Sequence, residues 1–379
     1  MSGLEQTLRR LAPPARLVDW SILGIILFGV ISGLVSFTVG RPSGWYVVWS
    51  HRVAGTMLIG LLAFKFARVR RRVTNTAAWQ PSTALSVLLG VVALTTLATG
   101  IAWGWIGLEW VVYWTVLSLH VGLGLVLIPL TIAHMTTRFR LPRRRDFQER
   151  RTALKYAGLL AAGGLVARGQ NALARASDTV GSVRRFTGSK PVDTGGAEPS
   201  DSESASAAGT GSFPVTAWVA DNPEPIDRDA WSVTVTGLVE EPLSLGYDEV
   251  QPEAPAGAIK GDAERALLDC TSGWYTVQQW EGVRVGDLLE AAGTAEDAAY
   301  VRFVSVTGYR WSLPLAEARE ALLATDVAGE PLTHGHGAPA RLVAPGRRGF
   351  QWVKWVDRIE VRARGDPEQW VVTLVSGFD

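Results

Sequence analysis

The sequence predicts an N-terminal all-α transmembrane helical bundle followed by a separate C-terminal α+β domain with mixed sheets. Three observations predict this fold class: four long apolar runs, a reversal of charge along the chain, and short β-rich runs from residue 213 onward. Residues 1–155 carry 18 Lys or Arg against 5 Asp or Glu, whereas the remainder of the 379 residues carries 19 against 31. A basic, apolar front with an acidic back is typical of a membrane anchor that carries another domain. It argues against nucleic acid as a partner, because a nucleic-acid binder places its positive charge on a polar face.

Residues 1–145 are predicted to form a four-helix transmembrane domain. The apolar runs, at residues 18–39, 50–67, 83–105 and 111–135, are each long enough for a hydrocarbon core of about 30 Å, which needs roughly 20 helical residues. Arginines cluster before the first run, after the second and after the fourth, which places these three ends in the cytoplasm. The connections on the other side, at residues 41–49 and 104–110, are poor in Lys and Arg and rich in Trp, as expected at the outer interface.

Three histidines lie inside these runs, where a polar ring needs a partner. His51 begins the second run near the outer face, and His120 lies two to three turns into the fourth run from the same face. His134 returns to the same helix face about 21 Å further inward. Two histidines at one depth on different helices suit the axial positions of a b-type haem. The alternative is that each histidine bonds to a neighbouring helix or a lipid headgroup.

This half of the chain resembles the four-helix b-type cytochromes that serve as membrane partners of oxidoreductases. The resemblance implies that His51 and His120 bind haem iron and pass electrons to or from the membrane quinone pool or another carrier. The inner half of the second helix offers Lys65 and no histidine, so one haem b is expected rather than two.

Residues 146–169 contain Arg150-Arg151 followed by a Gly- and Ala-rich apolar run, which looks like an internal twin-arginine export signal. Such a signal would add a fifth transmembrane helix and place the C-terminal domain on the extracytoplasmic side of the cell membrane. The alternative is a short buried or interfacial helix, because the run is only about 16 residues long. Residues 170–212 are dominated by small and polar residues without apolar periodicity, and we predict a flexible linker there.

Residues 213–379 are predicted to form the α+β domain. Short β-rich runs are punctuated by Gly and Pro, and two short helices are expected around residues 285–292 and 315–323. The absence of a G-x-G-x-x-G motif after a strand and of a P-loop argues against nicotinamide and nucleoside-triphosphate chemistry. The expected strands are residues 231–239, 301–306, 309–315, 341–344, 353–361 and 370–375.

Cys270 is the single cysteine, which excludes an intramolecular disulfide and any four-cysteine metal site. It begins the loop-like stretch Cys270-Thr-Ser-Gly-Trp274. A second motif cluster follows, with Gly329-Glu-Pro-Leu332, the run from His336 through Arg341 to Pro345, and Gly349-Phe-Gln-Trp-Val-Lys-Trp355. A thiolate is suited to a soft transition metal, although a lone cysteine is more often a small buried apolar residue.

These two clusters resemble the molybdopterin-binding domain of the sulfite oxidase family, including its bacterial sulfoxide-reductase branch, over most of residues 215–379. The resemblance implies that Cys270 is the catalytic residue and the protein ligand to molybdenum. It further implies that a set of residues binds the pterin and its phosphate, with Lys354 also apt for an anion. That set is Ser305, His336, Arg341, Gly349, Phe350 and Gln351.

The sequence thus predicts a membrane-bound molybdopterin-dependent oxidoreductase that transfers oxygen atoms on a small sulfoxide- or sulfite-type substrate. Residues 271–275 provide no arginine to hold an oxyanion, which weakens sulfite as the substrate. Two alternatives come from other classes. One is a zinc-dependent hydrolase-like site at Cys270, His334 and His336, although no catalytic carboxylate motif accompanies it. The other is a cofactor-free, membrane-tethered binding module.

Overall fold

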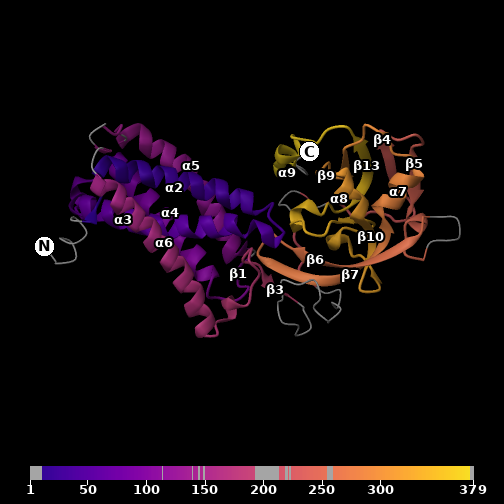
Figure 1. Cartoon of the computed structure of the whole chain (residues 1–379), viewed down its shortest axis with the longest axis horizontal. Helices are drawn as coiled ribbons and strands as arrows, with labels where there is room; N and C mark the ends of the chain where they lie inside the picture. Colours follow the sequence, from indigo (N-terminus) through magenta and orange to yellow (C-terminus); the bar gives the residue numbers. More distant parts are fainter. Residues whose placement is uncertain are drawn as a thin grey trace. The chain divides into compact units, whose positions relative to one another are not determined.

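The computed structural model describes residues 11–112, 114–138, 140–143, 146–147, 150–192, 213–217, 221, 223–253 and 259–375. It divides into two compact units, Met1–Lys190 and Pro191–Asp379. The first is helical and the second contains the β-sheets (Figure 1).

Four long helices of the first unit confirm the four predicted apolar helices: α2 (Ala15–Ser36), α3 (Trp45–Thr74), α4 (Pro81–Trp103) and α5 (Val116–Arg138). All four are long and apolar enough to cross a membrane. α4 begins with Pro81, whose fixed φ suits a first helical turn. The fourth run differs at its start, because β1 (Trp110–Val111) and β2 (Trp114–Thr115) pair there and the helix begins only at Val116. α3 begins at Trp45, so His51 lies nearly two turns inside the helix.

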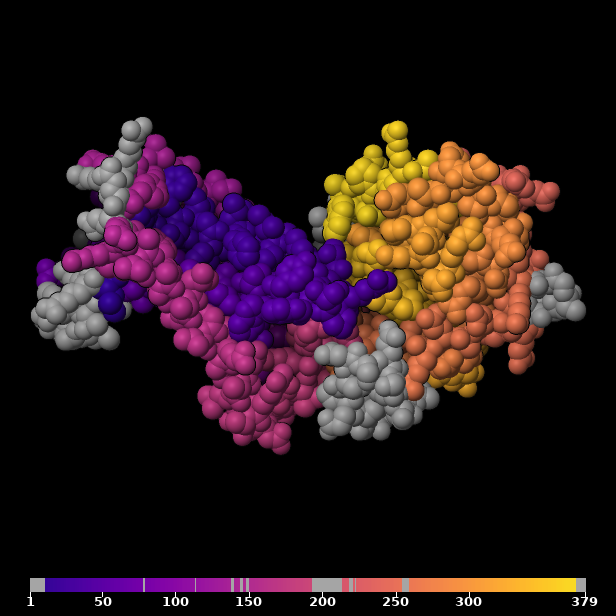
Figure 2. Space-filling model, viewed as in Figure 1, coloured from indigo at the N-terminus to yellow at the C-terminus, as the bar shows by residue number. Residues whose placement is uncertain are grey.

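The helices of this unit share a small apolar core and leave other apolar side chains outside. α2 packs on α3, and α4 packs on α5. Large apolar side chains remain exposed on α2, α4 and α5, including Leu27, Ile31, Val91, Leu94 and Ile132. Figure 2 shows the side-chain surface of this unit in indigo to magenta. An outward apolar surface on long helices is what a lipid-facing bundle presents. The core comprises Val18, Ile22, Ile26, Leu58, Leu61, Ala93 and Leu127.

A further helix, α6 (Arg150–Ala176), packs along α3. Its 27 residues include the start of the expected linker, since residues 170–176 continue the helix through Ala, Leu and Arg, which are good helix formers. The chain then returns to the unit, where Gly181 donates a backbone hydrogen bond to Trp105 and Lys190 Nζ donates to the carbonyl of Trp103 at 2.9 Å. The rest of the expected linker, residues 193–212, lies outside the described residues. α6 is not among the four helices apolar enough to span a membrane, and the fifth crossing stays a prediction.

The second unit contains two sheets, which confirms the α+β prediction. One sheet has the order β5 (Leu243–Gly246), β4 (Ser232–Gly237), β13 (Val356–Arg362), β8 (Tyr300–Ser305) and β9 (Arg310–Pro314). β13 runs parallel to β4 and antiparallel to β8, so this sheet is mixed. Two short helices, α7 (Val285–Ala291) and α8 (Leu315–Glu320), lie close to the predicted positions.

The other sheet carries the long hairpin of β6 (Gly261–Asp269) and β7 (Trp274–Arg284), which pair in register over nine residues. β7 also pairs with β10 (Leu322–Val327), and β10 pairs with β11 (Glu330–Pro331) and β12 (Arg341–Val343). β3 (Lys190–Pro191) completes the order. The hairpin and β12 supply most of the residues discussed below.

The strand predicted over residues 370–375 is wrong, because the structure forms a helix there, α9 (Gln369–Val375). The backbone N–H of Glu368 donates to Asp366 Oδ1 at 3.1 Å, and the N–H groups of Val371 and Val372 donate to the Glu368 carbonyl. Asp followed by Pro is a strong helix start, since the carboxylate accepts the first free N–H and Pro lacks one. This start outweighs the β preference of Trp, Val and Thr.

Candidate functional site

Cys270 lies at the tip of the β6–β7 hairpin, where the turn holds its backbone and its sulfur. Its N–H donates to the carbonyl of Trp274 at 2.8 Å, and its own carbonyl accepts from Gly273 at 3.1 Å. The N–H of Ser272 points at Sγ from 3.4 Å, and Thr216 Oγ1 lies 3.3 Å from it. The turn therefore holds the sulfur between a backbone N–H and a hydroxyl group. The side chain is only 8% exposed.

The Gly349-Phe350-Gln351 turn, η7 (Gly349–Gln351), lies directly against Cys270. A Cβ added at Gly349 would meet Cys270 Cα and Leu268 Cδ1 at 3.2 Å each, a tight contact that a larger residue could make only if these neighbours shifted. Arg348 precedes the turn and was missed in the sequence. Its guanidinium pairs with Asp269 at 3.2 Å and donates to the carbonyl of Cys270 at 3.1 Å. The buried ion pair between Asp269 and Arg348 therefore holds these two residues in place beside Cys270.

We expect Asp269→Asn to lower the free energy of unfolding by about 3–5 kcal/mol, because it leaves the buried Arg348 charge without its carboxylate. Both side chains are almost fully buried, at 1% and 3% exposure. The matched control is Asp262→Asn. Asp262 is 42% exposed and pairs with Arg284, so this change should cost less than about 1 kcal/mol. Calorimetric unfolding of the purified full chain measures both, and equal losses would contradict the role given to the Asp269–Arg348 pair.

Arg341 and Lys354 both lie near Cys270. Arg341 donates to the carbonyl of His336 at 2.9 Å, and its guanidinium lies over the rings of Trp280 and Trp352. Burial lowers the pKa of Arg341 to about 10, and the neighbouring Cys270 acts in the opposite direction. Burial, reinforced by Arg341, lowers the pKa of Lys354 to about 7, while Cys270 and Asp221 oppose that shift. The structure therefore brings the Cys270 sulfur together with Arg341 and Lys354.

His336 has a different surrounding from the one the motif implies. Its ring stacks on Phe213 with centroids 4.0 Å apart, and Nε2 lies 3.0 Å from the Phe213 carbonyl. Because a carbonyl only accepts, Nε2 carries the proton, and Nδ1 accepts from the Thr333 hydroxyl at 3.1 Å. Burial lowers the pKa of His336 to about 4, which keeps the ring neutral. Both ring nitrogens thus bond to protein, and the residue positions Arg341 through its carbonyl.

Ser305 ends β8 in the other sheet and bonds to Thr307 at 3.1 Å. The Tyr309 hydroxyl donates to the carbonyl of Phe350, which connects this strand end to the η7 turn. Asp221 belongs to the same region, since Thr307 and Lys354 both lower its pKa, although burial raises it overall. Thr216 and Asp221 were missed in the sequence because they precede Cys270 by about fifty residues and belong to no motif.

The described residues leave a group of buried N–H donors without an acceptor near Cys270: the Nε of Arg341, the Nε of Arg348, Nε2 of Gln351 and Nε1 of Trp352. Buried polar groups normally have partners, and every member of this group is a donor. Such a set suits a ligand rich in acceptor atoms and negative charge. Within the described ranges no three His, Cys, Asp or Glu side chains lie close enough to hold a metal ion, so the zinc alternative loses support.

A second arrangement lies in the helical unit. The rings of His51 on α3 and His120 on α5 lie edge to face with centroids 6.0 Å apart. His51 Nδ1 lies 3.0 Å from the carbonyl of Gly29, and His120 Nδ1 lies 2.8 Å from that of Thr96. Because both acceptors are carbonyls, Nδ1 is protonated in each ring, and each Nε2 keeps its lone pair. The structure confirms that these two histidines meet, whereas His134 bonds to Ser86 further along the bundle.

The backbone of α4 at Gly100 lies very close to the ring of His120. A Cβ added at Gly100 would lie 2.7 Å from His120 Cε1, a contact that real side chains do not make. Two imidazoles that each bind one metal ion through nitrogen at about 2.0–2.1 Å place their ring centroids roughly 6 Å apart.

The second unit is similar in sequence to known proteins. Residues 220–370 match the family described as oxidoreductase molybdopterin binding domain. The uncharacterized oxidoreductase YuiH of Bacillus subtilis is 35% identical over 164 residues, which cover 42% of this chain and 79% of that protein. The protein-methionine-sulfoxide reductase catalytic subunit MsrP of Xanthomonas campestris is 35% identical over 152 residues, covering 35% and 44%. Human mitochondrial sulfite oxidase is 35% identical over 123 residues, covering 29% and 23%.

The chain spans less than half the length of the MsrP and sulfite oxidase relatives, but about four-fifths of YuiH. The unpartnered donors around Cys270 agree with an anionic pterin cofactor. The chain therefore belongs to the oxidoreductase family with the molybdopterin-binding domain, and it is an oxidoreductase enzyme.

Proposed function

We propose that this chain is a membrane-bound molybdopterin-dependent oxidoreductase that reduces a small sulfoxide by oxygen-atom transfer and receives its electrons through the helical unit. The observation that carries the proposal is Cys270, a buried sulfur against the turn that carries Gln351, together with unpartnered N–H donors on Arg341, Arg348, Gln351 and Trp352. When bound, the molybdenum centre supplies the two-electron oxygen-atom transfer. In that assignment Cys270 binds the metal, and Arg341, Lys354 and the η7 turn hold the anionic part of the cofactor.

The residues around Cys270 favour a sulfoxide over sulfite as the substrate. The turn after Cys270 carries no arginine. Arg348 is occupied by Asp269 and the Cys270 carbonyl, and Arg341 lies between two indole rings. Within the described residues, Arg341 and Arg348 each keep one unpartnered Nε, which this proposal gives to the cofactor. No further guanidinium is then left beside the sulfur to hold a small dianion, and a neutral sulfoxide needs none.

The test compares the two directions on the detergent-purified full chain. We expect methionine sulfoxide or dimethyl sulfoxide to be reduced with a reduced viologen dye as donor. Sulfite oxidation with ferricyanide as acceptor should be at least about a hundredfold slower, which corresponds to roughly 3 kcal/mol of discrimination. Faster sulfite oxidation would reverse the proposed direction, and inactivity in both assays of a molybdenum-loaded preparation would refute the assignment.

The proposed electron path uses a haem b bound between His51 and His120. Both rings present an unprotonated Nε2, their separation suits two axial ligands, and Gly100 leaves the space that ring placement needs. We further propose that α2 to α5 cross the cell membrane, because their outward side chains are apolar and arginines cluster at one set of ends. The quinone pool, or another membrane carrier, is the proposed electron donor.

The proposed location of the second unit, outside the cytoplasm, rests on α6 acting as a fifth crossing after Arg150-Arg151. A cysteine introduced at Ser232, whose side chain is exposed, reports the side directly, because Cys270 is buried. A membrane-impermeant maleimide should label it in intact cells. Labelling only after the cells are broken would place this unit in the cytoplasm.

We expect the cofactor-free protein to become more stable as the pH rises from 7 to 9, because of Lys354. Its pKa is about 7 in the folded state, below the ordinary value of about 10.4, so the unfolded chain binds more protons in this range. The free energy of unfolding should rise by up to about 1.4 kcal/mol per pH unit. His336 does not contribute, since its folded pKa of about 4 affects stability only at lower pH.

The measurement is urea unfolding at several pH values, with protein from a host that cannot make molybdopterin. Lys354→Met should lower the slope between pH 7 and 8, whereas Lys190, whose pKa burial lowers to about 8, keeps a slope above pH 8. The bound, anionic cofactor should weaken the Lys354 contribution, since negative charge raises the pKa of Lys354. An unchanged slope between pH 7 and 8 in Lys354→Met would assign it to other groups.

A further inference from the structure

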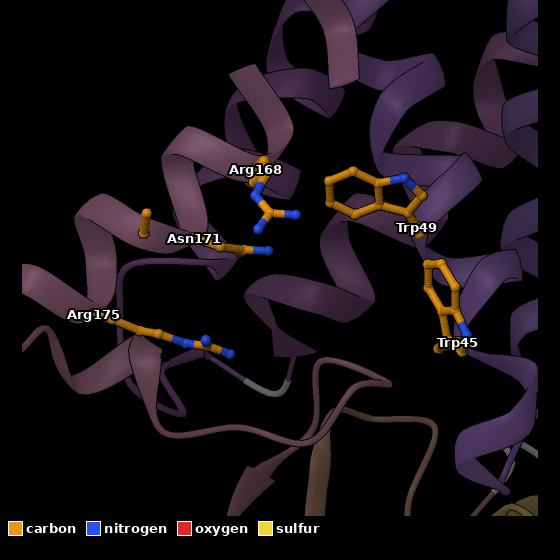
Figure 3. A pocket seen from close by; sticks show the side chains of 6 residues that line it. Trp45, Trp49, Arg168, Asn171 and Arg175 are labelled. Carbon is orange, nitrogen blue, oxygen red and sulfur yellow. The ribbon is translucent and has the colours of Figure 1, made fainter. Parts of the chain in front are cut away.

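The helical unit contains a pocket that belongs to neither site described above. It lies between the first turns of α3 and the last turns of α6, and its volume is about 460 Å³. This falls within the range of about 300–1,000 Å³ of small-ligand pockets. Figure 3 shows the indole rings of Trp45 and Trp49 on one side and the side chains of Arg168, Asn171 and Arg175 on the other.

The surroundings of this pocket are strongly cationic. Asn171 Oδ1 accepts hydrogen bonds from Arg52 and from Arg184, the latter at 2.6 Å, so one amide holds two further arginines behind the pocket. Four arginines form no ion pair with a carboxylate in the part of the chain that the structure describes: Arg52, Arg168, Arg175 and Arg184. Burial lowers the pKa of Arg184 to about 10, and the positive charges of Arg52 and Arg175 lower it further. Four like charges at one place, none of them ion-paired with a carboxylate in the described residues, favour an anion.

The surface beside the pocket is apolar and aromatic. Leu165, one turn before Arg168 and on the same side of α6, is exposed at 71%, and Tyr46 of α3 is exposed at 61%. A free anion would leave these side chains in water, whereas an acyl chain would cover them. Trp and Tyr beside arginines are also what proteins place at the level of lipid headgroups.

We propose that this pocket binds the phosphate group of an anionic phospholipid, with an acyl chain along Leu165 of α6 and Tyr46 of α3. Arg168 and Arg175 contact the phosphate, and Arg52 and Arg184, held by Asn171, supply the field behind it. The indole rings of Trp45 and Trp49 cover the glycerol region. The inference relies on the proposed membrane placement but not on the haem or the oxygen-atom transfer.

The test measures phospholipid binding to the detergent-purified full chain by native mass spectrometry. Phosphatidylglycerol should be retained in preference to phosphatidylcholine. The double substitution Arg168→Gln/Arg175→Gln should weaken its binding by at least about tenfold, since each removes a charge-assisted hydrogen bond. Arg319→Gln/Arg364→Gln removes two exposed arginines of the second unit and should leave the affinity unchanged. The helix signal in far-ultraviolet circular dichroism and its thermal midpoint check that the helical unit of every variant is folded.

Inorganic phosphate and glycerol phosphate are the competing probes. If either protects the chain from thermal unfolding as well as the lipid does, and the pocket substitution removes that protection, the site takes a free anion and the lipid assignment fails. Equal affinity of the pocket variant and the control for phosphatidylglycerol would also overturn it. Failure of the chain to fractionate with membranes would instead refute the membrane placement, so the two failures are distinct.

Discussion

Cys270→Ser should reduce oxygen-atom-transfer activity by at least about a thousandfold, which corresponds to roughly 4 kcal/mol of lost transition-state stabilisation. Serine fits the same turn, because the backbone bonds of residue 270 to Trp274 and Gly273 do not involve the side chain. The change replaces a soft sulfur ligand by a hard oxygen that stays protonated near neutral pH. The site should keep its shape and lose its ligand.

The measurement combines viologen-driven sulfoxide reduction with molybdenum and pterin analysis of the same preparation. We expect the pterin to be retained better than the metal, since its donors, Arg341 and the η7 turn, are unchanged. The melting temperature should stay within a few degrees. Activity within tenfold of the unaltered chain would remove Cys270 from the reacting centre, whatever the metal content.

His120→Leu should abolish the haem absorption bands and quinol-driven turnover together, while turnover driven by a reduced viologen dye continues. Leucine fills the space of the ring but offers no ligand, and one imidazole is not enough for a six-coordinate b-type haem. His134→Leu is the matched control, because it removes a histidine from the same helix at a depth where it bonds to Ser86. We expect that variant to keep its haem spectrum.

Measuring quinol-driven and viologen-driven turnover separately distinguishes electron supply from the oxygen-atom transfer itself. Loss of both activities in His120→Leu would show that the helical unit supports the second unit structurally. An unchanged spectrum would assign any haem to other residues. A purified chain without haem bands, but with viologen-driven activity, would reduce the bundle to an anchor and leave the oxygen-atom transfer standing.

The helical half could be predicted from sequence because apolar runs of membrane length have few alternative structures. The β6–β7 hairpin of the second unit could not be predicted from the sequence. β6 reads Gly-Asp-Ala-Glu-Arg-Ala-Leu-Leu-Asp, whose Ala, Glu, Arg and Leu favour helix and show no strict alternation. Pairing with β7 along its whole length overrides that preference, and only the three-dimensional partner reveals it.

The candidate site also contains some residues that the sequence indicates and others that it does not. Cys270, Arg341 and the Gly349 turn stand in motifs, and the structure places them together. His336 stands in a motif as well, yet both of its ring nitrogens bond to protein. Arg348 was missed although it directly precedes Gly349, because its partner Asp269 lies eighty residues away and no local pattern announces an ion pair.

The unpartnered donors on Arg341, Arg348, Gln351 and Trp352 have a consequence for the living cell. A ligand that satisfies them binds the native state alone and shifts the folding equilibrium by mass action. A chain made without it spends more time unfolded, where proteases remove it. When molybdenum or pterin is scarce, the amount of this protein should therefore fall along with its activity, so that supply of the cofactor sets abundance without any dedicated regulator.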